Sequence, residues 1–409
     1  MSRSDTAAMA EASLSSQMIA EMRKLIGTDL RIDHSVFNDR ATPLAVVKFT
    51  SGIGDVNPLW MSQEHGATSP YGRPIAPPSF VIGCFSGVQF GWPGLGSFHS
   101  GSKLWFASPV YWEDFVYSSC RYDGFEGPRR SGFAERAVID QFTNRYTNQL
   151  GVEIAHIEWY VFNFERATAR RRPRQKLPHE PHRWEPEELE SIEAQILAEK
   201  VRGPQPRLWE DVAIGDELDP LTKGPVGLTD EIAFVAGGGA PIPRLAANAA
   251  ALAEYARHPA WAFRDPVTGA REPIFSVHYN ERAARAMGVP YAYDVGFQRQ
   301  CWQVQLLTNW IGDDAWIKYC EAQYRSHVLL GDVVRLGGRI TAKAVDKDGD
   351  HTIEVKTCAT NQRGLDVMPG SAIIALPSRH DDMSPAARRA RSVEPLETMG
   401  WQPRPRAVA

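Results

Sequence analysis

Two blocks of this chain recur at one constant spacing. Residues 54–60, with the sequence Gly-Asp-Val-Asn-Pro-Leu-Trp, are echoed by residues 272–278, with the sequence Glu-Pro-Ile-Phe-Ser-Val-His. Residues 109–116 are echoed by residues 327–334, and both pairs share one offset, since 278 − 60 = 218 and 327 − 109 = 218. A constant offset over two separated blocks predicts a duplicated domain. The copies differ in chemistry, because the first keeps a carboxylate and the second an imidazole.

The bulk composition narrows the class of protein. The chain has 409 residues, of which 43% are hydrophobic and 23% charged, as in ordinary soluble globular proteins. Its formal net charge of −4 argues against nucleic acid as the main partner, because phosphate binding needs a clustered positive surface. We therefore expect a protein that acts on small molecules or on other proteins.

The cysteines and the apolar segments indicate the compartment. The five cysteines are odd in number and form no Cys-x-x-Cys pair, which predicts reduced thiols, no disulfide framework and no metal site. We find no signal peptide, and no stretch approaches the roughly 20 apolar residues of a membrane span. The sequence therefore predicts a cytoplasmic protein that does not enter a membrane.

Changes in composition divide the chain into five segments. The expected boundaries are 1–26 for a polar leader, 27–168 for a first domain, 169–207 for a linker, 208–377 for a second domain and 378–409 for a flexible tail. The leader contains one expected helix near Ser16–Ile26, and Pro186 opens an acidic helix in the linker. The linker also carries the basic run Arg170–Arg174, which fits a solvated linker better than a phosphate site.

The two domains share one order of elements. A long apolar helix is expected over Pro78–Gln89 in the first domain and over Val295–Trp310 in the second. Alternating segments predict strands at 101–107, 115–122, 135–144, 153–164, 315–325, 332–345, 351–361 and 371–375. One helix followed by an antiparallel meander predicts an α+β fold, with the helix on one face of the sheet.

Several segments resemble one known family. Phe49–Leu59 resembles the hydratase motif of MaoC-like proteins, the (R)-specific enoyl-CoA hydratases and related dehydratases. Tyr71–Phe80 resembles the segment before the central helix in their fatty-acid-synthase-like dehydratase branch, and Trp209–Leu218 resembles the start of the family's domain. The resemblance covers most of the chain. It implies an α+β fold of two tandem hot-dog domains, each with a long helix wrapped by a curved antiparallel sheet.

The resemblance also implies a chemistry. The family motif places Asn two residues and His five residues after an Asp, so that carboxylate and imidazole act on one water at an α,β-unsaturated thioester. Asp55 and Asn57 match in the first copy, but Trp60 stands at the histidine position. His278 matches in the second copy, where proline and phenylalanine stand at the other two positions. Asp55 and Asn57 also fit an Asx turn that starts a helix, which is the interpretation we favour.

Five residues of the second domain form the candidate site. His278 is the expected proton-transfer group. Asp294 could replace the missing carboxylate or cap the long helix. The Gly296 N–H could polarise the thioester carbonyl, or Gly296 could simply begin the helix. Tyr293 could donate a hydrogen bond to the thioester oxygen, and Arg299 could hold a carboxylate or phosphate of the ligand. The simpler alternatives are aromatic packing for Tyr293 and a salt bridge for Arg299.

The functional expectation is hydration of an enoyl thioester, or dehydration of a 3-hydroxyacyl thioester, with a bulky acyl group. Coenzyme A or an acyl carrier would enter as part of the substrate, and no separate cofactor or metal is expected. Two alternatives stay open, a non-catalytic acyl-thioester-binding subunit or scaffold and a hot-dog thioesterase. The sequence leaves both a homodimer and a hetero-oligomer open as the assembly.

Overall fold

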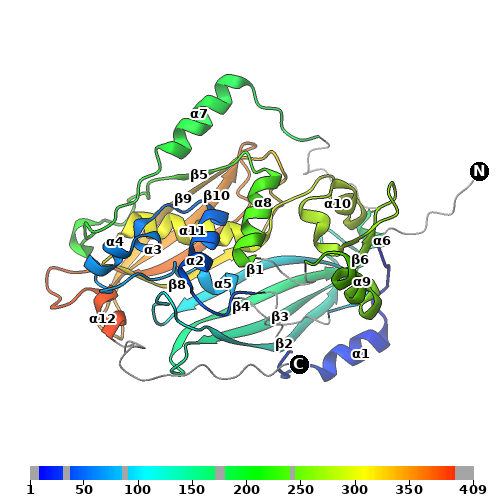
Figure 1. Ribbon diagram of the computed structural model, residues 1–409, viewed down its shortest axis with the longest axis horizontal. Helices are drawn as coiled ribbons and strands as arrows, with labels where there is room; N and C mark the ends of the chain where they lie inside the picture. Colours follow the sequence, from blue (N-terminus) through cyan, green and yellow to red (C-terminus); the bar gives the residue numbers. More distant parts are fainter. Residues whose placement is uncertain (1–8, 31–36, 85–90, 171–179, 240–244, 392–409) are drawn as a thin grey trace, which may run out of the picture.

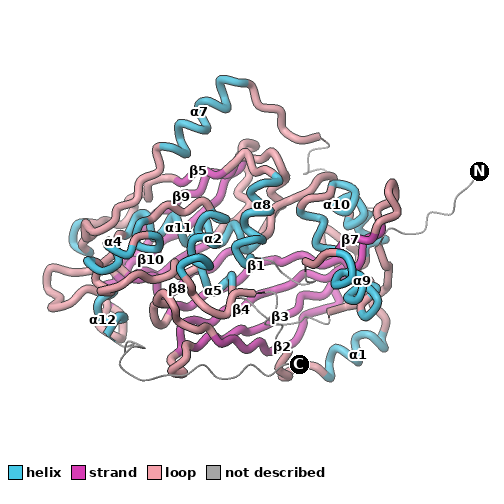
Figure 2. The backbone as a smooth tube through the Cα atoms, in the orientation of Figure 1, coloured by secondary structure: helices cyan, strands magenta, loops and turns pink. Residues whose placement is uncertain are grey.

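The centre of the molecule is one continuous sheet to which both halves of the chain contribute (Figures 1 and 2). The computed structural model describes residues 9–30, 37–84, 91–170, 180–239 and 245–391. Within them the sheet has nine strands in the order β2-β3-β4-β1-β8-β11-β10-β9-β5, and every neighbouring pair is antiparallel. The expected α+β double hot-dog architecture is confirmed.

The eight strands expected from the sequence are all present. The first half supplies β1 (Gly96–Phe106), β2 (Tyr117–Arg129), β3 (Ala137–Thr147) and β4 (Glu153–Phe164), and the second supplies β5 (Leu221–Lys223), β8 (Trp316–Gln323), β9 (Val334–Val345), β10 (His351–Asn361) and β11 (Gly370–Ala375). The second half also has a separate two-stranded sheet, formed by β6 (Ala262–Arg264) and β7 (Arg271–Pro273).

The long helix of the second half is α11 (Gly296–Ile311), one residue displaced from the expected span. It contacts β8, β9 and β1, and it is buried along almost its whole length. In the first half, the helix expected over Pro78–Gln89 is seen as α5 (Phe80–Gly83), and residues 85–89 of that expectation lie outside the described residues.

Shorter helices complete the fold. They are α1 (Ser16–Lys24), α2 (Pro43–Ile53), α3 (Pro58–Met61), α4 (Gln63–Thr68), α6 (Arg166–Arg170), α7 (Pro186–Leu197), α8 (Leu228–Phe234), α9 (Asn248–Arg257), α10 (Glu281–Met287) and α12 (Pro385–Arg391), with 3-10 turns at Trp209–Asp211, Pro259–Trp261 and Ile274–His278 and a π-turn at Val235–Gly239. Helices α2 and α8 pack so closely that a Cβ on Gly52 would lie 2.6 Å from the Ala233 carbonyl oxygen.

The duplication is visible in matching contacts. An isolated bridge joins Ile75 to Tyr111 in the first half, and another joins Tyr293 to Leu329 in the second. Both members of the second bridge follow those of the first by the expected offset, since 293 − 75 = 218 and 329 − 111 = 218. The segments beginning at residues 109 and 327 therefore occupy equivalent places in the two halves.

The two halves meet at an approximate two-fold axis. Strands β1 and β8 pair antiparallel, and Lys103 lies opposite Glu321, which is its own repeat because 321 − 103 = 218. Pairing a residue with its repeat places the axis between these two positions. The nine strands thus form a hot-dog pair within one chain.

The linker and the tail are more ordered than expected. Helix α7 faces solvent, as predicted, but its Ile192 is buried. The tail was expected to be flexible, and its first part instead forms α12, because Arg388 and Arg389 both bond to the Asp350 carboxylate. The rest of the tail (392–409), the start of the leader (1–8) and most of the basic run after Arg170 lie outside the described residues.

Candidate active site

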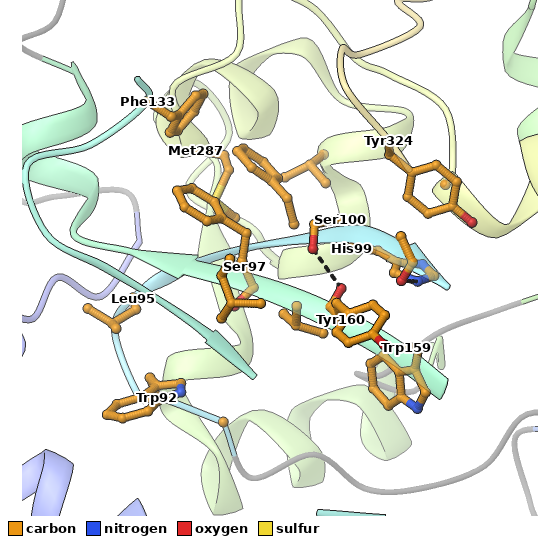
Figure 3. A pocket seen from close by; sticks show the side chains of 18 of the residues that line it. Trp92, Leu95, Ser97, His99, Ser100, Phe133, Trp159, Tyr160, Met287 and Tyr324 are labelled. Atoms are coloured by element: carbon orange, nitrogen blue, oxygen red, sulfur yellow. Dashed lines mark hydrogen bonds between the residues drawn. The ribbon is translucent and has the colours of Figure 1, made fainter. Parts of the chain in front are cut away.

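A large cavity opens between the two halves (Figure 3). Its volume is about 1930 Å³, and it is lined by β1 of the first half and by the start of α11 of the second. Single ligand pockets usually enclose about 300–1,000 Å³. All five candidate residues of the second half line this cavity, namely His278, Tyr293, Asp294, Gly296 and Arg299.

His278 ends the 3-10 turn Ile274–His278, and a short hydrogen bond holds its ring. Its Nδ1 lies 2.7 Å from the carbonyl oxygen of Tyr293. Because a carbonyl oxygen can only accept, Nδ1 carries the proton and Nε2 keeps a lone pair. Burial lowers the pKa of His278 from 6.5 to about 4. At neutral pH the ring is therefore an uncharged base.

Asp294 is not a helix cap. The N-cap residue of α11 is Val295, and no side chain caps this helix. The Asp294 carboxylate instead lies 2.5 Å from Arg299 Nε and accepts a 3.3 Å hydrogen bond from the Val328 N–H. Burial raises the pKa of Asp294 to about 6, and Arg299 opposes this rise. The carboxylate is thus part of a buried ion pair.

Arg299 donates its hydrogen bonds to groups inside the protein. Its Nη1 donates to the carbonyl oxygens of Ser326 at 2.9 Å and Val367 at 3.2 Å. Its guanidinium carbon also lies 5.0 Å from the centre of the Tyr324 ring. The side chain is 5% exposed, so the geometry favours the salt-bridge interpretation over ligand binding.

Gly296 is the first residue of α11, and the packing there excludes a side chain. A Cβ at this position would lie 2.9 Å from Cε2 of Tyr324. The start of a helix favours negative charge, because its first N–H groups have no partner within the helix. Tyr293 is buried, and its ring meets that of His278 edge to face, with centres 5.0 Å apart.

Asp55 and Asn57 lie outside the large cavity and stabilise a turn. Asp55 accepts hydrogen bonds from the Asn57 N–H at 3.0 Å and from the Trp60 Nε1–H at 2.9 Å. Asn57 accepts from the Leu59 N–H at 3.0 Å and so caps α3. The tryptophan that replaces the family histidine therefore occupies one oxygen of the carboxylate. This geometry agrees with the Asx-turn interpretation.

Three further histidines, His99, His258 and His327, line the cavity and were missed from the sequence. His99 Nε2 lies 3.1 Å from the Gly101 carbonyl oxygen, and burial lowers its pKa to about 3. His327 lies against Phe98 and Tyr293, with ring centres 4.8 Å apart in both contacts. The sequence did contain one indication of His327. The repeat aligns this histidine with Pro109, so only the second half has an imidazole at this position.

The described residues contain no group of three or more His, Cys, Asp or Glu side chains arranged to hold a metal ion. Within the same ranges, no helix combines the length and the apolar character that crossing a membrane requires.

Comparison with known proteins agrees with the resemblance. Residues 35–157 match the family model described as a FAS1-like dehydratase domain region. A solved protein described as a MaoC-like dehydratase aligns with a TM-score of 0.59 at 12% identity, covering 87% of this chain and 100% of its own. A putative MaoC domain dehydratase from Chloroflexus aurantiacus J-10-fl aligns with a TM-score of 0.53 at 16% identity, covering 87% and 96%.

The description of a third similar structure states its fold. A conserved hypothetical protein from Mycobacterium tuberculosis, described as a double hot-dog fold, aligns with a TM-score of 0.50 at 12% identity, covering 85% of this chain and 96% of its own. No curated protein matches the sequence. The match over residues 35–157 and the shared fold confirm the resemblance to the MaoC-like hot-dog dehydratases.

Proposed function

We propose that this relative of the MaoC-like hot-dog dehydratases adds water to an α,β-unsaturated acyl thioester, or removes it from a 3-hydroxyacyl thioester. The observation that carries the proposal is the state of His278, an uncharged imidazole with an unprotonated Nε2 in the wall of a large cavity. Gly296, at the start of α11, lines the same cavity and offers an N–H where negative charge is favoured.

These groups can carry out hydration. His278 Nε2 takes a proton from water while the water oxygen bonds to C3 of the thioester. The electron pair of the double bond moves toward the thioester oxygen, where the Gly296 N–H stabilises the enolate, as in other oxyanion sites. A proton then reaches C2 and restores the carbonyl. Dehydration is the reverse, and no redox partner or metal is needed.

The wall of the cavity supports a bulky acyl group. Aromatic side chains from both halves face the space, among them Trp92, Phe133, Trp159 and Tyr324 (Figure 3). Such surfaces favour large apolar or ring-containing ligands, because burying apolar area is favourable. We propose coenzyme A or an acyl carrier as the thiol, with no further cofactor. The five unpaired cysteines fit a reducing compartment such as the cytoplasm.

A hydration assay tests the proposal. The protein would be given a panel of (E)-2-enoyl-CoA esters from short linear to polycyclic acyl groups, and loss of the conjugated thioester followed. His278→Gln keeps a polar side chain but removes the base, and we expect kcat to fall about 10²–10⁴-fold. His380→Gln, at an exposed histidine outside the cavity, is the matched control. Undiminished turnover by His278→Gln would remove His278 from the mechanism.

A second candidate is a non-catalytic acyl-thioester-binding subunit. The observation in its favour is that both candidate carboxylates are engaged, Asp55 by Trp60 and Asp294 by Arg299. Calorimetry that shows tight thioester binding without turnover would support this role, in a homodimer or with a different partner chain. Release of free thiol in the same experiment, followed with a thiol reagent, would instead indicate a thioesterase.

A further inference from the structure

A second imidazole lies in the same part of the cavity as His278. His327 also lines the cavity, and its ring centre lies 4.8 Å from that of Tyr293. The His278 ring lies 5.0 Å from the same tyrosine ring. The two imidazoles therefore flank one aromatic side chain, and their centres are no further apart than the sum of these distances. An acyl group beside Tyr293 would be within reach of both.

One short segment holds both imidazoles in place. The Tyr293 carbonyl oxygen accepts the hydrogen bond from His278 Nδ1. The next residue, Asp294, fixes the backbone just after His327, because its N–H donates to the Val328 carbonyl at 2.9 Å and its carboxylate accepts from the Val328 N–H at 3.3 Å. Residues 293 and 294 thus connect the two histidines.

Arg299 fixes the backbone on the other side of His327. Its Nη1 donates to the Ser326 carbonyl oxygen at 2.9 Å, while its Nε faces the Asp294 carboxylate. The buried ion pair therefore holds the residues before and after His327. This arrangement gives Asp294 and Arg299 a role in positioning His327, whereas the sequence led us to expect Asp294 to orient His278 or the water.

The duplication supplies an independent observation. The first-half equivalents of His278 and His327 are Trp60 and Pro109, and neither can transfer a proton. The first-half equivalent of Asp294 is Ala76, since 294 − 76 = 218, so the ion pair is missing there as well. Both imidazoles and the pair that positions one of them occur together in the second half alone.

We propose that His327 is a second proton-transfer residue of this site, which rests on the proposed function. In hydration, His278 Nε2 takes the proton from water as the oxygen bonds to C3. His327 gives a proton to C2 as the enolate reverts to the carbonyl. His278 then loses its proton to solvent and His327 regains one, so that the net change is addition of one water. His327 thus takes the place of the missing motif carboxylate.

The test separates proton transfer from packing. His327→Phe keeps a ring against Tyr293 and Phe98 but cannot carry a proton, and we expect kcat to fall at least 100-fold with KM little changed, in line with the loss of one general acid. His327→Ala should lose activity similarly and recover part of it when free imidazole is added. His380→Gln is again the control, with activity and thermal midpoint as in the wild type.

The outcomes distinguish the two proposals. Turnover by the wild type together with an active His327→Phe variant would overturn the role of His327 and leave the proposed function standing. The same holds if His327→Phe is unstable and His327→Ala, although folded, shows no response to imidazole. A wild type without turnover on any thioester of the panel would overturn both proposals. Both proposals are supported if kcat falls in His327→Phe and free imidazole restores part of the activity of His327→Ala.

Discussion

At the scale of single residues, the protonation state of His278 decides the chemistry. Its pKa is lowered to about 4, so the base stays uncharged well below neutral pH. Protonation of His278 should therefore lower kcat/KM tenfold per pH unit only below about pH 4, because kcat/KM reports ionisations of the free enzyme. A separate, earlier fall is expected near pH 6, where Asp294 takes up a proton and its ion pair with Arg299 is lost. A profile with no further fall below about pH 4 would remove His278 as the base.

Trp60 offers a test of the structural role of Asp55. Trp60→Phe removes the indole N–H and leaves one oxygen of a buried carboxylate without its 2.9 Å partner. We expect a loss of about 1–3 kcal/mol in the free energy of unfolding, measured in urea. Turnover of the folded variant should equal that of the wild type. A marked loss of kcat without loss of stability would indicate that Asp55 has a catalytic role.

At the scale of elements, the buried side of α8 carries an unusual group. Glu231 is 1% exposed, and within the described residues neither carboxylate oxygen makes a hydrogen bond of good geometry. Burial and the nearby Asp294 raise the pKa of Glu231 well above its usual value, and the Val295 N–H and Arg299 oppose this only in part. The neutral acid is therefore the form that the folded protein prefers.

This preference predicts the direction in which stability changes with pH. A pKa raised on folding means that the folded state binds more protons, so the stability from Glu231 is present at low pH and is lost as pH rises through the folded pKa. We expect Glu231→Gln to be more stable than the wild type by about 1–3 kcal/mol at pH 8, with a smaller gain at pH 5. Urea unfolding at the two pH values measures this. An equal gain in stability at pH 5 and pH 8 would show that Glu231 does not titrate between these two values.

The elements also show what the sequence could predict. The bounds of β4 and β10 are those expected, and α11 differs by one residue, because the apolar period of these segments is set locally. The three-residue β5 was not expected, since a strand that short has no period. A salt bridge was among the expectations for Arg299, but its contacts with Ser326 and Val367 could not be predicted, because they are fixed only by packing of α11 on the sheet.

At the scale of the whole molecule, the two halves depend on each other. The cavity has walls from both, and β1 pairs with β8 across the approximate two-fold axis. The repeat in the sequence predicted two related units but not their shared sheet, because pairing of distant strands leaves no local signal. The same limit explains why His327 was missed, since its contact with Phe98 joins the two halves.

The junction of β1 and β8 can be tested at Gly101. A Cβ there would lie 2.6 Å from the Ala322 carbonyl oxygen of β8, where backbone cannot easily give way. Gly101→Ala should therefore weaken the contact between the halves. Gly151→Ala is the matched control, because Gly151 also has a positive φ (79°) but nothing lies within 4 Å of its Cβ position. The control isolates backbone strain, which costs about 1–3 kcal/mol at such a residue.

Because the sheet is continuous, we expect Gly101→Ala to lower the midpoint of a single unfolding transition rather than to split it. Urea unfolding followed by far-ultraviolet circular dichroism and by tryptophan fluorescence should give coincident curves. The midpoint should fall further than in Gly151→Ala, and kcat should fall as well, since residue 101 lines the cavity. Two separate transitions, or a loss no larger than that of the control, would mean that each half folds and holds its shape alone.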